Sequence, residues 1–119
     1  MIGLHARALD YSKLPGLDEA AMTERIDAGF GATVAAGFDA VSCLIDASPD
    51  AAEAVVREAF AADTFGLVMI GGGIRMFAEH TLLFERIVNV CNAESPGIAF
   101  CFNSSPETSL DALRRHVQL

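Results

Sequence analysis

The sequence has no tryptophan, one lysine, three histidines and three cysteines among its 119 residues. The odd number of cysteines and the lack of Cys-x-x-Cys spacing argue against a disulfide framework or a zinc site. Gly-x-Ser-x-Gly, the nucleophile elbow of the α/β-hydrolases, is also absent. The histidines are too scattered to form a metal-ligand cluster. We therefore expect buried, reduced cysteines, and neither a metal nor a cofactor.

Long apolar runs and basic charge are equally scarce. Glycine or a charged residue interrupts every apolar run well before the roughly 20 residues that span a bilayer, and the N-terminus lacks a signal-peptide pattern. We therefore expect a cytoplasmic protein without a membrane partner. Eight basic and 16 acidic residues give a net charge of -8. This disfavours DNA and RNA as partners, because nucleic-acid affinity depends on cationic side chains that displace counterions.

What the sequence does contain is apolar residues in an alternating pattern of short strands and longer helices. Hydrophobic residues make up 52% of the chain, enough for one sizeable core, so residues 1–119 should form a single domain. The predicted strands lie at 1–4, 40–46, 65–70 and 98–102. The predicted helices lie at 18–36, 49–62, 78–94 and 106–117, with Asp18 and Ser48 as the expected N-caps of the first two. The alternation predicts an α/β three-layer sandwich, with a four-stranded parallel sheet and helices on both faces. The flavodoxin-like strand order 2-1-3-4 is preferred to the Rossmann-like order 3-2-1-4.

The first long helix carries one apolar stripe and two internal glycines. Its stripe consists of Met22, Ile26, Phe30 and Val34, which recur every four residues. Gly29 and Gly31 each cost about 1 kcal/mol relative to alanine inside a helix. We expect these glycines to permit close approach to the sheet.

Three consecutive glycines, Gly71, Gly72 and Gly73, follow the most apolar predicted strand. Because the loops after parallel strands meet at one edge of the sheet, this turn should lie near Asn103 and Ser104. Its backbone N–H groups, together with Arg75, predict a site for a small anionic molecule such as a carboxylate or phosphate. The alternative is a tight strand-to-helix connection. The turn does not match the dinucleotide fingerprint Gly-x-Gly-x-x-Gly, and a phosphate-loop lysine is missing.

A second hypothesis is a small hydrolase or isomerase. His80 or His5 would act as general base, and Glu79 or Asp46 would supply an acid. Adjacent residues on a helix point about 100° apart, so Glu79 and His80 cannot easily act on the same substrate. Each of these residues is also typical of an ordinary protein surface.

The predicted helix 78–94 has an apolar arc wider than packing on a sheet requires. One side should pack on the sheet and the other on a second subunit, which predicts a homo-oligomer, most simply a dimer. A third hypothesis is therefore a structural or interaction module whose function is to assemble through this helix.

Spaced residues in the second half of the chain carry a family resemblance: Gly71-x-Gly73-x-Arg75, His80-x-x-Leu83-Phe84-Glu85-x-x-x-Asn89, Pro96, and Phe102-Asn103-x-x-Pro106-x-Thr108. This set resembles a family of short, uncharacterised bacterial and fungal α/β proteins. The resemblance implies no assigned activity. It implies one constellation made of Arg75, His80, Glu85, Asn89 and Asn103. The chain departs from the pattern at Met76-Phe77, where prolines would be more typical.

Overall fold

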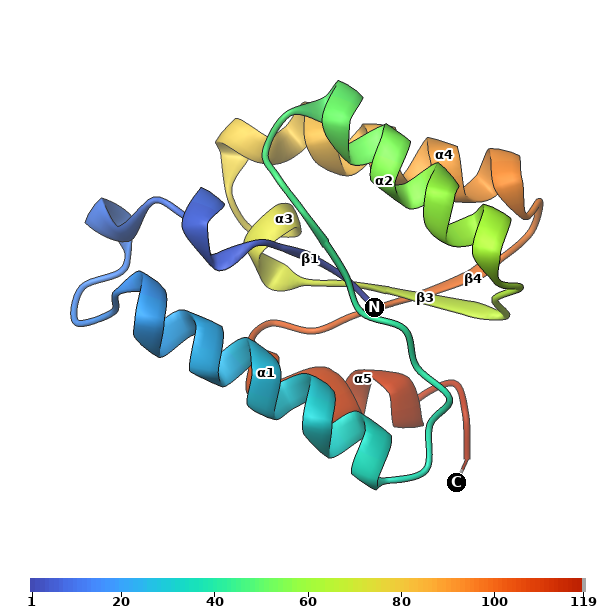
Figure 1. The fold of residues 1–119 in the computed structure, drawn as a ribbon, viewed down its shortest axis with the longest axis horizontal. Helices are drawn as coiled ribbons and strands as arrows, with labels where there is room; N and C mark the ends of the chain where they lie inside the picture. The colour runs from blue at the N-terminus through green and yellow to red at the C-terminus, as the bar shows by residue number, and fades with distance from the viewer. Residues whose placement is uncertain (119) are drawn as a thin grey trace.

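A computed structural model describes residues 1–118 as a four-stranded sheet between two layers of helices (Figure 1). The strands are β1 (Ile2–Leu4), β2 (Cys43–Ile45), β3 (Leu67–Ile70) and β4 (Ala99–Phe102). All pairs are parallel and the order is β2-β1-β3-β4. The predicted α/β sandwich and the preferred order 2-1-3-4 are therefore confirmed. The last residue of the predicted domain 1–119 lies outside the described residues.

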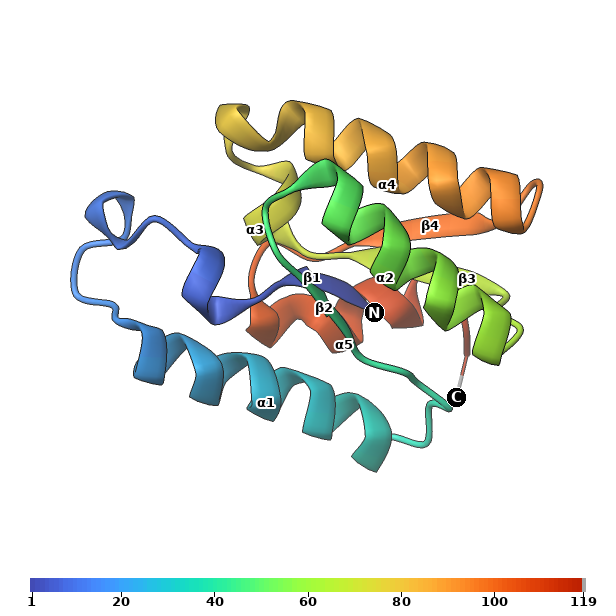
Figure 2. The ribbon, with the colours of Figure 1, turned by 45° about the horizontal axis from the view of Figure 1, so that its top comes forward.

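Two helices cover each face of the sheet (Figure 2). One face carries α1 (Glu19–Ala35) and α5 (Ser109–Arg114), and the other carries α2 (Pro49–Ala62) and α4 (Thr81–Glu94). The shorter elements are α3 (Gly72–Arg75) and the 3-10 turns η1 (Ala6–Ala8), η2 (Tyr11–Lys13), η3 (Ala78–His80) and η4 (Pro106–Thr108). None of the helices within residues 1–118 combines the length and the hydropathy that crossing a membrane requires.

Two of the crossover helices, α1 and α2, begin at side-chain caps. The Asp18 carboxylate accepts a hydrogen bond from the Ala21 N–H at 2.8 Å, and the Ser48 hydroxyl accepts one from the Ala51 N–H at 3.4 Å. Each cap satisfies one of the N–H groups that a helix leaves unpaired in its first turn. These starts were predicted from the sequence and are confirmed.

The main core lies between the sheet and the layer formed by α2 and α4. Successive strand residues point to opposite faces. The side chains facing this layer are those of Ile2, Leu4, Cys43, Ile45, Val68 and Ile70, all of them buried. A smaller cluster on the other face contains Met69, Cys101, Ala112 and Leu113. All three cysteines are free and buried, as expected.

The wide apolar arc of α4 has partners within its own chain. Leu83, Ile87, Val90 and Cys91 are buried in the main core, where α4 packs on α2 as well as on the sheet. Leu82, which is 71% exposed, is the large apolar residue that α4 leaves to solvent. The width of the arc therefore gives no separate reason for a second subunit, and the dimer stays a prediction.

Helix α1 differs from its expected packing. Its main partners are η1, η4 and α5. A Cβ added at Gly29 would lie 2.6 Å from the Pro106 carbonyl oxygen, whereas one added at Gly31 would meet nothing within 4 Å. The prediction that these glycines allow close approach to the sheet is therefore wrong. Gly29 allows close contact with η4, and no atom lies near enough to Gly31 to require a glycine there. Val34, at the end of the predicted apolar stripe, is 49% exposed.

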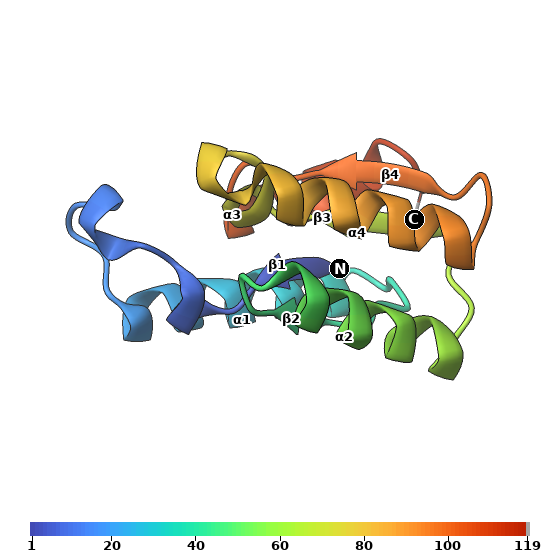
Figure 3. The same ribbon diagram turned by 90° about the horizontal axis from the view of Figure 1, so that it is seen from above.

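The sheet has its least extensive strand pairing between β1 and β3. These strands pair only at Ile2 and Ile70, whereas β1–β2 and β3–β4 pair at three and four positions. One hydrogen bond at this junction runs from the Gly71 N–H to the Ile2 carbonyl oxygen at 2.9 Å. Figure 3 shows α1, α2, β1 and β2 on one side of this seam and α3, α4, β3 and β4 on the other.

Candidate ligand-binding cavity

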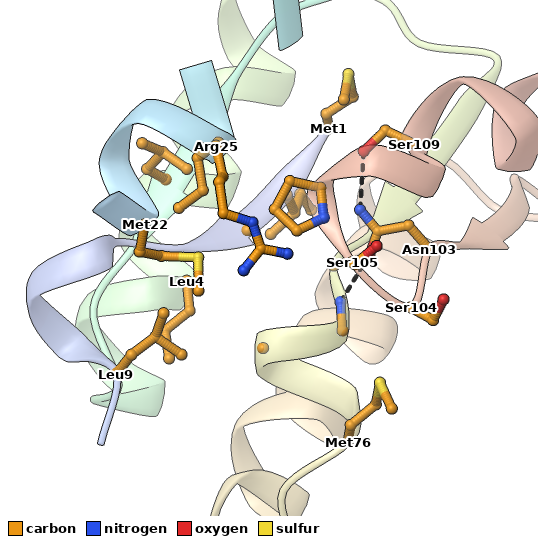
Figure 4. A pocket seen from close by; sticks show the side chains of 18 of the residues that line it. Met1, Leu4, Leu9, Met22, Arg25, Met76, Asn103, Ser104, Ser105 and Ser109 are labelled. Atoms are coloured by element: carbon orange, nitrogen blue, oxygen red, sulfur yellow. Dashed lines mark hydrogen bonds between the residues drawn. The ribbon is translucent and has the colours of Figure 1, made fainter. Parts of the chain in front are cut away.

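A cavity of about 280 Å³ lies between α1 and the sheet and reaches the triple-glycine turn (Figure 4). Its floor comes from β1, β2 and β3, and one wall comes from α1. The other walls come from the segment before α1, from α3 and from the loop between β4 and α5. The cavity therefore lies where neighbouring β1 and β3 send their chains to opposite faces, the usual ligand position in open α/β sheets.

Part of the cavity floor is formed by small residues, beside the larger Leu44 and Met69. Ile2 and Leu4 point to the main core, so Gly3 between them faces the cavity. A Cβ added at Gly3 would meet one heavy atom within 4 Å, the Leu44 Cδ2 at 3.5 Å. Ser42, directly before β2, lines the same floor. Small residues at these positions leave space that a close-packed interior would otherwise fill.

The walls are mainly apolar. All four methionines of the chain line the cavity: Met1, Met22, Met69 and Met76. Leu9, Leu14 and Leu17 from the segment before α1 line it as well. Methionine is unbranched and polarizable, and it adapts its shape to different apolar ligands. The lining therefore suits an apolar molecule and does not demand one shape.

Arg25 is the one ionisable side chain among the lining residues of the described chain. Its Nε donates to Glu107 Oε1 at 2.6 Å, and its Nη2 donates to Glu107 Oε2 at 2.8 Å. These bonds hold the pKa of Glu107 at about 2, so that carboxylate is ionised at neutral pH. Figure 4 shows the guanidinium of Arg25 reaching into the cavity between Met22 and Ser105.

The triple glycine forms the start of a short helix rather than an open turn. Gly71 is the N-cap of α3, and the Gly72 N–H donates to Asn103 Oδ1 at 2.8 Å. The amide of Asn103 donates in turn to Ser109 Oγ at 2.9 Å. A Cβ at Gly72 would lie 3.0 Å from the Ser104 carbonyl oxygen, so the close approach of these two loops favours glycine. Asn103 thus fixes the turn, and one of the two predicted anion donors is already occupied.

Arg75 does not line the cavity. Its Nη2 donates to the Asn103 carbonyl oxygen at 3.0 Å, and its guanidinium lies 5.4 Å from the centre of the Phe102 ring. The predicted ligand residues that do line the cavity are Gly71, Gly72, Gly73, Asn103 and Ser104. The structure therefore brings five of the six predicted ligand residues to one cavity and turns Arg75 toward the end of β4.

The predicted acids and bases lie outside the cavity. Asp46 forms a two-point pair with Arg7, which lowers the pKa of that carboxyl group, and His5 Nδ1 accepts from the Arg7 N–H at 3.3 Å. Glu79 pairs with Lys13 at 2.7 Å, and this pairing likewise lowers the pKa of Glu79.

The fourth candidate, His80, packs edge-on beside Phe77, with the ring centres 6.4 Å apart. No group of three His, Cys, Asp or Glu side chains within residues 1–118 is placed to hold a metal ion. The structure thus assembles no acid–base pair against the cavity from these candidates.

The five residues implied by the family resemblance do not form one constellation in the described part of the chain. Arg75 and Asn103 are in contact, as given above. Glu85 is exposed and forms no ion pair with Arg75 or Arg86. Arg86 pairs instead with Asp50 and Glu53.

Sequence reasoning did not identify Gly3, Ser42 or Arg25. The alternation of strand residues was the signal that could have found the first two, because each is a small residue at a position facing α1. Arg25 lies one position before Ile26 on the apolar stripe of α1, but its pairing with Glu107 joins residues 82 positions apart. Such a contact has no local signal in the sequence.

Comparison of the chain with protein-family models, with curated proteins and with solved structures finds no match, so the family resemblance stays a prediction.

Proposed function

We propose that this protein binds a small, mainly apolar molecule in the cavity between α1 and the sheet. The observation that carries the proposal is the lining: an apolar space of about 280 Å³ surrounded by all four methionines and bordered by a few polar groups. Concave, largely apolar surfaces with a few convergent polar groups are typical of small-molecule sites.

The volume limits the size of the ligand. If each non-hydrogen atom takes roughly the 30 Å³ that a water molecule occupies in the liquid, the space holds roughly nine such atoms. Short aliphatic chains and single substituted aromatic rings are of this size. A dinucleotide or a peptide of several residues would not fit.

The polar end of the ligand would be held differently from the sequence-based expectation. That expectation placed an anion on the Gly72 and Gly73 N–H groups and on Arg75. Gly72 and Arg75 already have protein partners. Two other groups at the cavity wall can take this role: the N–H of Gly73, near the start of α3, and the guanidinium of Arg25.

The other two hypotheses stay predictions. A hydrolase or isomerase would need an acid or base against the cavity, and His5, His80, Asp46 and Glu79 all lie elsewhere. An assembly module would need an unpartnered face, whereas α4 packs within its own chain. The cytoplasmic location and the homodimer also stay predictions.

Filling the cavity tests the proposal. Gly3→Val adds three carbons to the cavity floor, in a strand that accommodates β-branched residues well. A panel of aliphatic and aromatic compounds with roughly nine non-hydrogen atoms should contain members that raise the melting temperature of the wild type. These members should have little effect on Gly3→Val.

The matched control is Gly66→Val, because Gly66 lies outside the cavity and a Cβ there meets nothing within 4 Å. Its response to the panel should equal that of the wild type. The proposal is wrong if no member stabilises the wild type. It is also wrong if Gly3→Val responds as strongly as Gly66→Val.

A further inference from the structure

We propose that the ligand of this cavity is uncharged and that it accepts one hydrogen bond through a carbonyl oxygen from Nη1 of Arg25. This inference rests on the proposed function and assigns the ligand's chemical class. It replaces the anion expected from the sequence with a neutral acceptor such as an amide, ester or ketone.

The first support is the hydrogen-bond pattern of Arg25. Glu107 occupies Nε and Nη2 in a two-point pair. Within residues 1–118, Nη1 has no hydrogen-bond partner. The pair fixes the guanidinium plane, because a carboxylate that binds two nitrogens at once permits one orientation. Glu107 therefore holds Arg25 in place while Nη1 stays available as a donor.

The second support is the charge balance around Arg25. The Glu107 carboxylate is ionised at neutral pH, so the Arg25–Glu107 pair carries no net charge. A ligand carboxylate would add a second negative charge to this pair, beside Glu107 and in a protein of net charge -8. Apart from the Met1 ammonium, which donates to the Val41 carbonyl oxygen at 2.8 Å, no other ionisable group on a lining residue of the described chain offers a balancing charge. A carbonyl oxygen would accept the same hydrogen bond without adding a charge.

The third support is the environment of the rest of the ligand. The methionine and leucine side chains described above surround the remaining space and offer no partner for a charged group. Moving a charged group out of water without a partner is far more costly than moving an amide that keeps a hydrogen bond. The ligand body should therefore be aliphatic or aromatic, with its one carbonyl group at the end near Arg25.

Two probes with the same chain and different ends test the inference. Octanamide and octanoate have nearly the same shape, but only octanoate is charged at neutral pH. In titration calorimetry with the full chain, octanamide should bind about tenfold more tightly than octanoate, because both probes accept the hydrogen bond from Nη1 and only octanoate brings an unbalanced charge into the cavity.

The Glu107→Gln variant provides the matched comparison. Glutamine keeps the length of the side chain but removes the charge that balances Arg25. Octanoate should then bind more tightly than it does to the wild type, and the preference for octanamide should disappear or reverse. A second variant, Arg25→Met, should weaken the binding of octanamide and should keep or increase the preference for octanamide over octanoate, because Glu107 then carries an unbalanced negative charge. Circular dichroism of both variants checks that they fold.

The outcomes separate the inference from the proposed function. If octanoate binds the wild type more tightly than octanamide, the neutral-ligand inference is wrong and the cavity remains a ligand site. An unchanged preference in Glu107→Gln also contradicts it, since the charge of that residue is the stated cause. If neither probe binds, and no compound of the thermal-shift panel does, the proposed function fails and the inference with it.

Discussion

Gly29 and Gly31 stand two positions apart in α1, and the same substitution should change stability in opposite directions. Alanine at Gly31 meets open space and should raise the free energy of unfolding by about 1 kcal/mol. Alanine at Gly29 would place its Cβ against the backbone of Pro106 and should lower it by about 1–3 kcal/mol. Urea denaturation of both variants measures the two values. Equal effects in the two variants would contradict the close contact between α1 and η4.

The lowered pKa of Glu107 predicts that the protein loses part of its stability in acid. Hydrogen bonds from Arg25 are the main cause that lowers its pKa from 4.5 to about 2. Because the folded pKa is depressed, the stabilisation is fully present above the unfolded value near 4.5 and is lost as pH falls toward 2. The side chain is 56% exposed, so the contribution should not exceed about 1 kcal/mol.

The comparison that isolates this effect is wild type against Glu107→Gln, because other carboxylates titrate in the same range. The wild type should be the more stable protein at about pH 6, and the difference should shrink at about pH 2.5. Urea unfolding at both pH values measures it. A difference that stays constant with pH would contradict the assigned pKa.

At the scale of single residues, the sequence predicted what depends on neighbouring positions. Asp18 and Ser48 were identified as helix caps because a cap bonds to a backbone group three residues later. Arg75 was placed beside the triple glycine because it is close in sequence. Its actual partner, the Asn103 carbonyl oxygen, lies 28 positions away. Long-range pairing of polar side chains is not encoded in a local pattern.

Among the elements, the segment between β1 and α1 has the clearest functional consequence. It contributes Leu9, Leu14 and Leu17 to the cavity wall and is tied to η3 by the Lys13–Glu79 ion pair. Its base is held by the Arg7–Asp46 pair. We expect the part between these ties to open most easily and to admit the ligand.

Lys13 makes this opening measurable, because it is the only lysine in the chain. A protease that cleaves only after lysine should cut the native protein in this segment and nowhere else. Glu79→Gln removes the ionic partner of Lys13 and should speed cleavage by up to about fivefold, as expected for an exposed pair worth up to about 1 kcal/mol.

The control for this experiment is Glu53→Gln, which removes an ion-pair partner of Arg57 and Arg86, far from the segment in sequence. Its cleavage rate should equal that of the wild type. Equal rates in all three proteins would show that the Lys13–Glu79 pair does not restrain the segment.

The long elements were predictable and the short ones were not. Helices α1, α2 and α4 each run for three turns or more, so their apolar periodicity and caps are visible in the sequence. Helix α3 has four residues, little more than one turn, and it begins with glycines that suggest an open turn. Its helical form depends on the hydrogen bond from Gly72 to Asn103, which no local pattern announces.

For the molecule as a whole, the buried cysteines report on global folding. Burial raises the pKa of all three thiols, and that of Cys91 to about 11. A thiol-specific reagent at about pH 8 should therefore react with none of them in the native protein and with all three after denaturation. The absorbance of the released chromophore measures the number of reactive thiols in the native and in the denatured protein. Rapid reaction of a native thiol would show that the core around it opens far more readily than a close-packed core should.

The strand order was predictable because the alternation of strands and helices leaves few topologies that obey right-handed crossovers. The cavity was not. It arises where Gly3 on β1 and Ser42 directly before β2 oppose an α1 that packs mainly on η1, η4 and α5. Whether a space remains above such small residues, or a facing side chain fills it, depends on the tilt of that helix. This tilt is a property of the assembled fold.

The single-residue pairing between β1 and β3 has a consequence for how the protein could be divided. A cut between α2 and β3 would produce two fragments, each with two strands and its own helices, whose exposed apolar faces are complementary. The cavity draws lining residues from both fragments, with Gly3 and Arg25 from one and Gly73 and Ser104 from the other. If the proposed ligand binds there, it would bridge the two pieces, and the two fragments could then serve as a ligand-dependent split reporter.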